Sequence, residues 1–200
     1  MIKNDKWIIE QARQGMITPF EEKSIRKAAL GTDKAIPTIS WGLSSYGYDI
    51  RLSPNDFRIF RHIPGTVVDP KNFNPKNLEQ AELHTDEDGS SYFIIPANSY
   101  GLGASLESIK MPPNVTAICL GKSTYARVGV IANTTPLEAA WEGHSITLEF
   151  SNASSADVKI YANEGVVQLL FFEGEICETT YADRGGKYQN QGSGVTLPKV

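Results

Sequence analysis

The sequence has few of the residues that cross-link a chain or bind transition metals. Among its 200 residues are two cysteines and three histidines. Cys119 and Cys177 are too few for a disulfide framework, so a reducing cytoplasm is the expected compartment. The histidines are isolated and the cysteines lie far apart without neighbouring ligands, so we expect neither structural nor catalytic zinc.

Long hydrophobic runs and an excess of positive charge are also missing. The apolar stretch at 166–172 is interrupted by Gln168, and it is far shorter than the roughly 20 residues that span a bilayer. The charged N-terminus predicts no signal peptide. With 19 basic and 23 acidic residues the net charge is −4, which provides no overall field for a nucleic acid or an anionic membrane. We therefore expect neither as a partner, and an anionic ligand requires local positive charge.

The residues that are present predict a mainly β protein. At 40% hydrophobic, 200 residues can bury one substantial core, so we expect a single domain over 1–200. From Ser40 onward, short apolar or alternating runs are separated by Gly, Pro, Asn and Asp, which is typical of a β-sandwich or barrel. The candidate strands are Tyr48–Leu52, Phe57–Arg61, Tyr92–Ile95, Tyr100–Ala104, Thr116–Leu120, Ser145–Phe150, Lys159–Tyr161 and Val166–Phe172.

One or two short helices are expected near the N-terminus. The first covers 5–15, with Asn4 or Asp5 as N-cap and Gly15 just past its end. A weaker pattern favours a second helix over 20–30. Residues 79–91 hold five carboxylates and little apolar bulk, so we expect a solvated surface loop without a catalytic role.

Two segments are free of acidic residues, namely 108–137 and 184–200. If they converge, their cations would form a positive pocket suited to a polyphosphate, although exposed cations spread over a surface would give the same count. The cations in question are Lys110, Lys122, Arg127, Arg184, Lys187 and Lys199.

Three further features could carry chemistry. Residues 121–129 (GKSTYARVG) follow an apolar run and offer backbone N–H groups, hydroxyls and an ammonium to phosphate oxygens, although a polar turn would look the same. The spacing is not that of a P-loop. In 145–150, alternation turns Glu149 away from the side chains that its own strand buries, which on most proteins means toward solvent. Gln168 lies in an apolar run and needs a partner, because an unsatisfied buried polar group costs about 1–3 kcal/mol.

Known hydrolytic motifs are missing. The chain has neither the H-x-E segment nor the P-C-x-x-C segment that hold zinc in metal-dependent base deaminases. It also has no G-x-S-x-G nucleophile elbow.

Five segments occur in order: GKSTYARVG, TTPLEAAWEGHSITLEFSN, KIYANEGVVQLLFFE, YADRGGKYQNQ and GVTLPK. Together with weaker matches at 4–8, 44–52 and 68–73, they resemble the bacterial dCTP deaminases of the dUTPase-like trimeric superfamily. The resemblance implies a distorted β-barrel or jelly-roll subunit, and a homotrimer with nucleotide sites at the subunit interfaces. It also implies that 184–200 close over the nucleotide. Mg²⁺ would be carried by the triphosphate and would have no protein side-chain ligand. The reaction would convert dCTP to dUTP and ammonia for thymidylate synthesis, with dTTP as a candidate inhibitor.

The resemblance also assigns roles to residues. Glu149 corresponds to the proton-shuttling carboxylate, Arg127 to its electrostatic support, and Ser123 to a hydrogen bond that holds the water or the amine. Backbone carbonyls near Thr135 and Pro136 are candidate acceptors for the cytosine amino group. Burial would raise the pKa of Glu149 and a nearby Arg127 would lower it, so the sequence leaves the direction open. The nucleotide-binding residues are Lys122, Ser123, Thr124, Tyr125, Ala126, Arg127, Thr147, Leu148, Glu149, Gln168, Tyr181, Lys187 and Gln191, with Lys122 and Lys187 on the triphosphate.

Two alternatives stay open. A dUTP pyrophosphatase or a bifunctional deaminase would share the fold. Those enzymes carry a Gly-x-Ile-Asp-like segment where this chain reads Pro136-Leu137-Glu138, and a C-terminal phenylalanine that RGGKYQNQGSG lacks. The other alternative is a nucleotide-binding trimer without turnover, against which the presence of Ser123, Arg127 and Glu149 argues.

Overall fold

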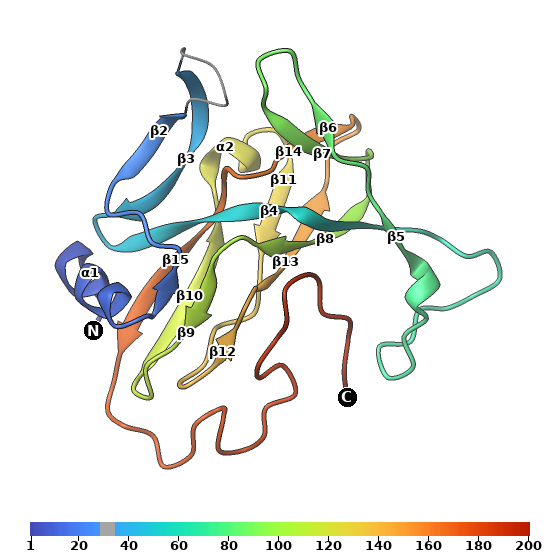
Figure 1. Cartoon of the computed structure of the whole chain (residues 1–200). Helices are drawn as coiled ribbons and strands as arrows, with labels where there is room; N and C mark the ends of the chain where they lie inside the picture. The colour runs from blue at the N-terminus through green and yellow to red at the C-terminus, as the bar shows by residue number, and fades with distance from the viewer. Residues whose placement is uncertain (29–34) are drawn as a thin grey trace.

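Antiparallel strands make up most of the regular secondary structure in this computed structural model, which describes residues 1–28 and 35–200 (Figure 1). The helical elements of that part are α1 (Asp5–Arg13), α2 (Ser123–Ala126) and the 3₁₀ turn η1 (Pro75–Asn77). The strands are β1 (Ile17–Thr18), β2 (Ser24–Ala28), β3 (Ile36–Ser44), β4 (Gly47–Phe60), β5 (Leu78–Gln80), β6 (His84–Thr85), β7 (Ser91–Ile95), β8 (Tyr100–Ser105), β9 (Ser108–Lys110), β10 (Val115–Gly121), β11 (Val130–Asn133), β12 (Glu142–Gly143), β13 (Thr147–Asn152), β14 (Val158–Tyr161) and β15 (Gly165–Glu173).

The main sheet curls until its ends lie close together. Its strands follow the order β10-β15-β4-β8-β13-β11, with β3 and β5 also paired to β4. At the ends of this path β10 approaches β11 so closely that a Cβ on Gly121 would lie 2.8 Å from the carbonyl oxygen of Ala132. Two smaller sheets, β1-β9-β12 and β14-β7-β6, flank it. The predicted mainly β, barrel-like fold is confirmed.

The core lies inside this curl and is centred on aromatic rings. Phe57 stacks on Phe93 with centroids 4.9 Å apart and tilts against Phe150 at 5.4 Å, and all three are fully or almost fully buried. Glycines in β8 make room for them. A Cβ on Gly103 would lie 3.0 Å from the Phe57 ring and 2.6 Å from a methyl of Leu52. Glycine inside a strand is expected where neighbours approach this closely.

The N-terminal helix is confirmed with its boundary signals. The Asn4 side chain accepts a hydrogen bond from the Trp7 amide at 3.2 Å, as an N-cap should. Ile8 and Ala12 are buried against the sheet, and Gly15 adopts a φ of 94° beyond the helix end.

Three local predictions are wrong or incomplete. Residues 24–28 of the predicted second helix form strand β2, which pairs with β3, while 29–30 lie outside the described residues. The two strands predicted over 48–61 form the single strand β4, whose pairing with β8 shifts register between Leu52 and Phe57. The loop predicted at 79–91 contains β6 and the ends of β5 and β7, because its polar residues lie on short edge strands.

Truncation of Phe57 tests the aromatic core. We expect Phe57→Ala to lower the free energy of unfolding by about 3–5 kcal/mol in urea denaturation, because it leaves a cavity between two rings. Val67→Ala is the control, since Val67 is 93% exposed and its loss should change stability by less than about 0.5 kcal/mol. Equal effects of the two substitutions would contradict the assigned core.

Candidate functional site

Glu149 lies on the outer face of β13, in a cavity of about 640 Å³. Burial alternates along this strand, with Leu148 and Phe150 fully buried and Glu149 partly exposed between them. The predicted orientation of the carboxylate is therefore confirmed. Thr147, two residues earlier, lines the same cavity.

Three parts of the chain complete the cavity wall. The loop after β11 contributes 134–138, and the loop between β4 and β5 contributes apolar side chains that include Phe73. The third part is the C-terminal segment, which passes in front of β13 and ends beside the loop between β4 and β5 (Figure 1). From this segment come Tyr181, Lys187, Tyr188, Gln191, Thr196 and Pro198.

The surroundings of Glu149 favour its protonated form. Burial raises the pKa of the carboxyl group above its usual value, and the hydrogen bond from Asn133 Nδ2 at 3.1 Å lowers it by less. Burial, with a smaller contribution from the charge of Glu149, raises the pKa of Tyr100 to about 12. Within one subunit, Arg127 is not among the groups that shift the pKa of Glu149. The sequence left open the direction in which the pKa of Glu149 shifts, and in the structure this pKa is raised.

Hydrogen bonds fasten the C-terminal segment over this cavity. Trp141 Nε1 donates to the carbonyl of Tyr188 at 2.9 Å, and the Thr196 amide donates to Thr147 Oγ1 at 2.9 Å. Ser145, predicted on the outer face of a strand, is instead buried before β13 begins. Its hydroxyl contacts the carbonyls of Gly192 and Gly194, each at 2.9 Å, so the position serves attachment of the segment.

The cavity wall offers groups for a polar ligand. The side-chain oxygen of Gln191 is buried and, within the described part of the chain, has no hydrogen-bond partner. Leaving a buried acceptor unsatisfied costs about 1–3 kcal/mol, which a ligand N–H or O–H could offset. Lys187 forms no ion pair with the residues that the structure describes, so its charge is available at the same wall.

The turn at α2 lies apart from Glu149 within the subunit. Strand β11 begins after α2 and ends at Asn133, which pairs with Glu149. Three residue steps along that strand span about 10 Å. Ser123, Thr124, Ala126 and Arg127 do not line the Glu149 cavity. Arg127 Nη1 donates to the carbonyl of Ser123 at 3.3 Å.

Three predicted binding side chains have partners inside the subunit. Tyr125 is buried, and its hydroxyl accepts a hydrogen bond from the Tyr161 amide at 2.9 Å. Lys122 and Gln168 both donate to Asp49. Leu148 is fully buried, so only its backbone can reach the cavity.

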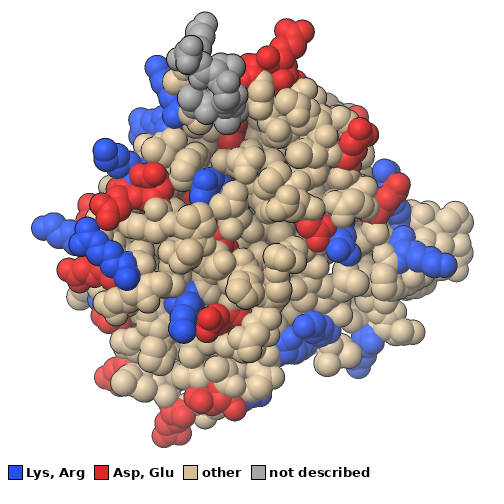
Figure 2. Space-filling view, in the orientation of Figure 1, with Lys and Arg blue, Asp and Glu red and all other residues tan. Residues whose placement is uncertain are grey.

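The two acid-poor segments meet at the cavity, but of their six cations only Lys187 lines it. Lys110 pairs with Glu142, Lys122 with Asp49 and Arg184 with Glu138, so acids from elsewhere in the sequence neutralise half of the cations. Basic and acidic side chains are likewise interspersed over the face shown in Figure 2.

The described residues show little that fits other kinds of functional site. No three His, Cys, Asp or Glu side chains among residues 1–28 and 35–200 converge as a metal-binding group. Both cysteines are free thiols, Cys119 buried and Cys177 exposed. In the same ranges, no helix has the length and apolar character needed to cross a membrane.

Comparison with known proteins decides the family. A sequence model of dCTP deaminase-like proteins matches residues 2–174. The chain belongs to this family of enzymes. It is 51% identical to a dCTP deaminase of Acinetobacter baylyi and 55% identical to one of Polaromonas, in each case over 100% of this chain and 99% of the relative.

A solved structure agrees on the fold. The crystal structure of 2'-deoxycytidine 5'-triphosphate deaminase from Agrobacterium tumefaciens superposes with a TM-score of 0.51 at 16% identity. The match covers 86% of this chain and 48% of that one, so this chain spans about half its length.

The sequence analysis missed three residues that contact the predicted site residues or the C-terminal segment: Asn133, Trp141 and Asp49. Asn133 ends an alternating run, Val130–Asn133, that a strand assignment would have placed on the outer face with Glu149. Trp141 and Asp49 lie in segments of the family resemblance, 134–152 and 44–52, but nothing local predicts their contacts, because their partners are distant in sequence.

The raised pKa of Glu149 predicts how stability varies with pH. Below the unfolded-state pKa the carboxyl is protonated in both states, and no penalty arises. As pH rises through the higher folded-state value, the native state must hold a partly buried charge and loses stability. We expect Glu149→Gln to raise the melting temperature relative to wild type at pH 7, and to do so less at pH 4.

Glu173→Gln provides the control of opposite sign. The hydrogen bond from Lys3 lowers the pKa of Glu173, so its ionised form stabilises the fold above that pKa and the benefit disappears in acid. Its substitution should therefore lower the melting temperature at pH 7 and matter less at pH 3. If Glu149→Gln also lowered the melting temperature at pH 7, this would contradict the destabilising effect of burying the Glu149 carboxylate.

Proposed function

We propose that this protein hydrolyses the 4-amino group of dCTP and releases dUTP and ammonia. The observation that carries the proposal is a partly buried glutamate with a raised pKa, set in a cavity large enough for a nucleotide. Relatives named dCTP deaminase that match over the full chain support the choice of substrate.

Glu149 would move protons at C4 and N3 of the base. Its carboxylate takes a proton from water as the oxygen attacks C4, and passes that proton to N3. It then takes the remaining hydroxyl proton and delivers it to the amino group, so that C4 becomes a carbonyl and ammonia leaves. A single carboxyl group can do both because its pKa lies nearer the working pH than that of an exposed glutamate.

The other half of the site would come from a second subunit of a homotrimer. Within one chain, Ser123 and Arg127 lie outside the cavity that holds Glu149. Near α2, the outer faces of β10 and β11 present Ile118, Leu120 and Ile131, each at least 42% exposed. Contiguous exposed apolar side chains of this kind mark surfaces that pack against a partner. Association would bury them and bring Ser123 and Arg127 to the neighbouring Glu149.

The C-terminal segment would close over the substrate. Lys187 supplies positive charge for the triphosphate, which carries Mg²⁺ as part of the substrate, and the unpaired oxygen of Gln191 accepts a hydrogen bond from the nucleotide. Carbonyls of Thr135 and Pro136 at the cavity wall would accept the cytosine amino group. Glu138 is ion-paired with Arg184, which argues against its orienting a water for pyrophosphate release.

Replacement of the carboxylate tests the proton transfers. We expect Glu149→Gln to lower kcat for ammonia release from dCTP by about 10²–10⁴-fold, because the amide cannot carry a proton in either direction. Binding of dCTP, measured by calorimetry, should persist, since the amide keeps the size of the side chain.

The products must be measured together with the rate. Ammonia with dUTP supports the proposal, whereas pyrophosphate with dUMP would show a bifunctional enzyme. Turnover by Glu149→Gln within twofold or so of wild type would reject the role of this residue.

Mixing two inactive variants tests the shared site. Glu149→Gln and Ser123→Ala subunits, unfolded together in equal amounts and refolded, should recover about one quarter of wild-type activity, because one interface in four then pairs an intact Glu149 with an intact Ser123. Each variant refolded alone should stay inactive. If both residues acted within one chain, mixing would restore nothing.

A further inference from the structure

Asn133 lies directly opposite Glu149, at the end of β11. Its side chain is exposed, and Nδ2 donates a hydrogen bond to Glu149 Oε2 at 3.1 Å. Side chains directly opposite each other on antiparallel strands start only about 5 Å apart, so this contact is a direct result of strand pairing. Among residues 1–28 and 35–200, Asn133 supplies the only side-chain hydrogen bond to the Glu149 carboxylate.

The position of Asn133 is set by the packing of its strand. Val130 and Ala132 are buried, so strand alternation turns the side chain of Asn133 outward. Gly121 allows β10 to approach Ala132 closely, since a Cβ on this glycine would lie 2.8 Å from the Ala132 carbonyl oxygen. The amide is therefore held beside Glu149 by the fold itself.

The hydrogen bond makes the two oxygens of the Glu149 carboxylate unequal. Oε2 accepts from Asn133, whereas Oε1 has no hydrogen-bond partner in the part of the chain that the structure describes. A donor favours negative charge on the oxygen that it contacts, so a proton taken up by the carboxylate goes to Oε1. Because a side-chain amide is neutral and does not titrate near neutral pH, Asn133 can hold Oε2 in both protonation states of Glu149.

Several titratable groups surround Glu149, but none of them replaces this donor. Tyr100 on β8 and Cys119 on β10 feel its charge, and burial, the largest cause, raises the pKa of each to about 12, so both stay neutral. The other groups of the cavity wall that can carry a charge are Glu138, Tyr181, Lys187 and Tyr188, and in the proposed trimer they would be joined by Arg127 of the partner subunit. None of these side chains hydrogen bonds with Glu149 in the described part of one subunit, so losing Asn133 would leave the carboxylate there without a donor.

We infer that Asn133 is a positioning residue for the proposed deamination, which holds Oε2 of Glu149 and so makes Oε1 the oxygen that moves protons. Oε1 then takes the proton from water, passes it to N3, and delivers the second proton to the amino group. This role rests on the proposed function and deepens it. It adds a residue from outside the segments that carry the family resemblance, since Asn133 falls between 121–129 and 134–152.

Asn133→Leu removes the donor and keeps the size of the side chain. The ionised carboxylate is the form that starts the proposed reaction, so kcat/KM falls in acid as Glu149 becomes protonated. Without Asn133 the ionised form is less favoured, and the pKa of Glu149 rises. We expect the acid midpoint of the kcat/KM profile to move about one pH unit higher, which lowers kcat/KM about tenfold at pH values below the wild-type midpoint.

The remaining loss should appear in kcat and not in KM. Asn133 does not line the cavity, so its removal takes no contact from the nucleotide. On the alkaline plateau, where Glu149 is ionised in both enzymes, kcat should fall by about threefold or more, because the carboxylate is no longer held in place. KM should stay within about twofold of wild type.

Asn133→Asp provides a second variant with the shape of the original side chain, and it supplies the test if Asn133→Leu does not fold. Its carboxylate repels the ionised form of Glu149, so the acid midpoint should again move to higher pH, by about one pH unit or more. An unchanged or lower midpoint in this variant would contradict the inference.

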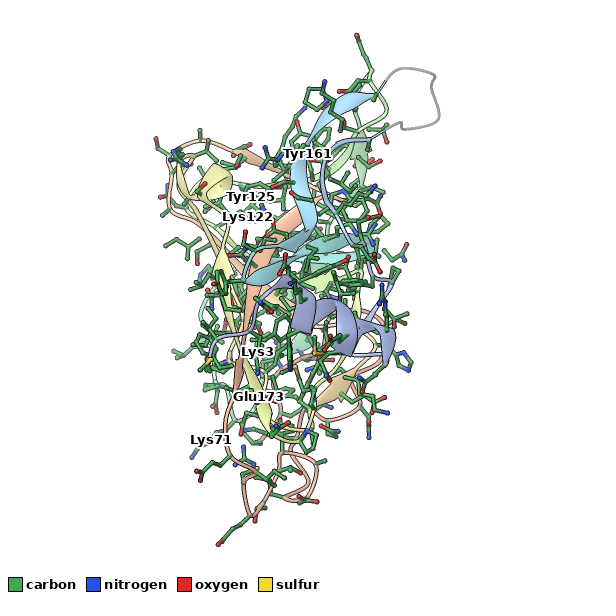
Figure 3. The ribbon with its side chains drawn as sticks, turned by 90° about the vertical axis from the view of Figure 1, so that its left-hand side faces the viewer. Lys3, Lys71, Lys122, Tyr125, Tyr161 and Glu173 are labelled. Atoms are coloured by element: carbon green, nitrogen blue, oxygen red, sulfur yellow. The ribbon has the colours of Figure 1, made fainter. Side chains whose placement is uncertain are left out.

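The matched control is Asn114→Leu. Asn114 Nδ2 donates to Glu173 Oε1 at 3.3 Å, so the variant removes the same kind of hydrogen bond from another glutamate. Neither residue lines the cavity, and in Figure 3 Glu173 lies beside Lys3, well below Tyr125 of α2. The acid midpoint and kcat should stay at wild-type values. Circular dichroism verifies that every variant is folded at the assay temperature.

Either of two results would overturn the inference: an acid midpoint for Asn133→Leu within about 0.2 pH unit of wild type, or an equal shift in Asn114→Leu. A wild-type protein that releases no ammonia would reject the proposed function instead. Carbon-13 NMR of the glutamate carboxyl groups, with Glu149 assigned by the loss of its signal in Glu149→Gln, then decides the role of Asn133. A higher pKa of Glu149 in Asn133→Leu supports the role, and an unchanged pKa overturns it.

Discussion

The pairing of β13 between β8 and β11 is the constraint on which the site depends. Leu148 and Phe150 must face the core, because they fill it next to Phe57. Strand periodicity then forces Glu149 onto the opposite face. A slip of one residue would bury the carboxylate and expose two large apolar side chains, so the packing of the core strongly disfavours it. The position of Glu149 is thus fixed by residues that do not touch the cavity.

Burial alone does not make a carboxylate useful, as a comparison with Glu107 shows. Burial raises the pKa of both groups. Glu107, however, is fully buried and held from two directions, since it accepts from Arg51 Nε at 2.7 Å and from the Arg51 amide at 2.9 Å. It is a structural ion pair with no access to a cavity. Glu149 has one neutral donor, Asn133, and an open side toward the cavity, so it can exchange protons with a ligand.

The sequence predicts features that short-range patterns determine. Helix α1 follows from Asn4 and Gly15, and the outward direction of Glu149 follows from alternation. Strand β2 could not be predicted this way, because the Lys- and Ala-containing run at 24–28 favours a helix locally, and only pairing with β3 makes it a strand. Likewise, Pro54 reads as the end of a strand, whereas β4 continues through it with a shift of register. Contacts such as Asp49 with Lys122 depend on the register of strands distant in sequence.

The separation of Glu149 from Arg127 within one subunit also affects the pKa that Glu149 would have in the proposed trimer. In one subunit the pKa of Glu149 is raised by burial, and the hydrogen bond from Asn133 opposes this only in part. In the proposed trimer a neighbouring Arg127 approaches, and its charge favours the ionised form. Association would therefore lower the pKa of the carboxyl from its raised value, toward the range in which it can both accept and return a proton near neutral pH. The charge of Lys122, already offset by Asp49, adds little to this effect, so Arg127 is the residue of the α2 turn that would set it.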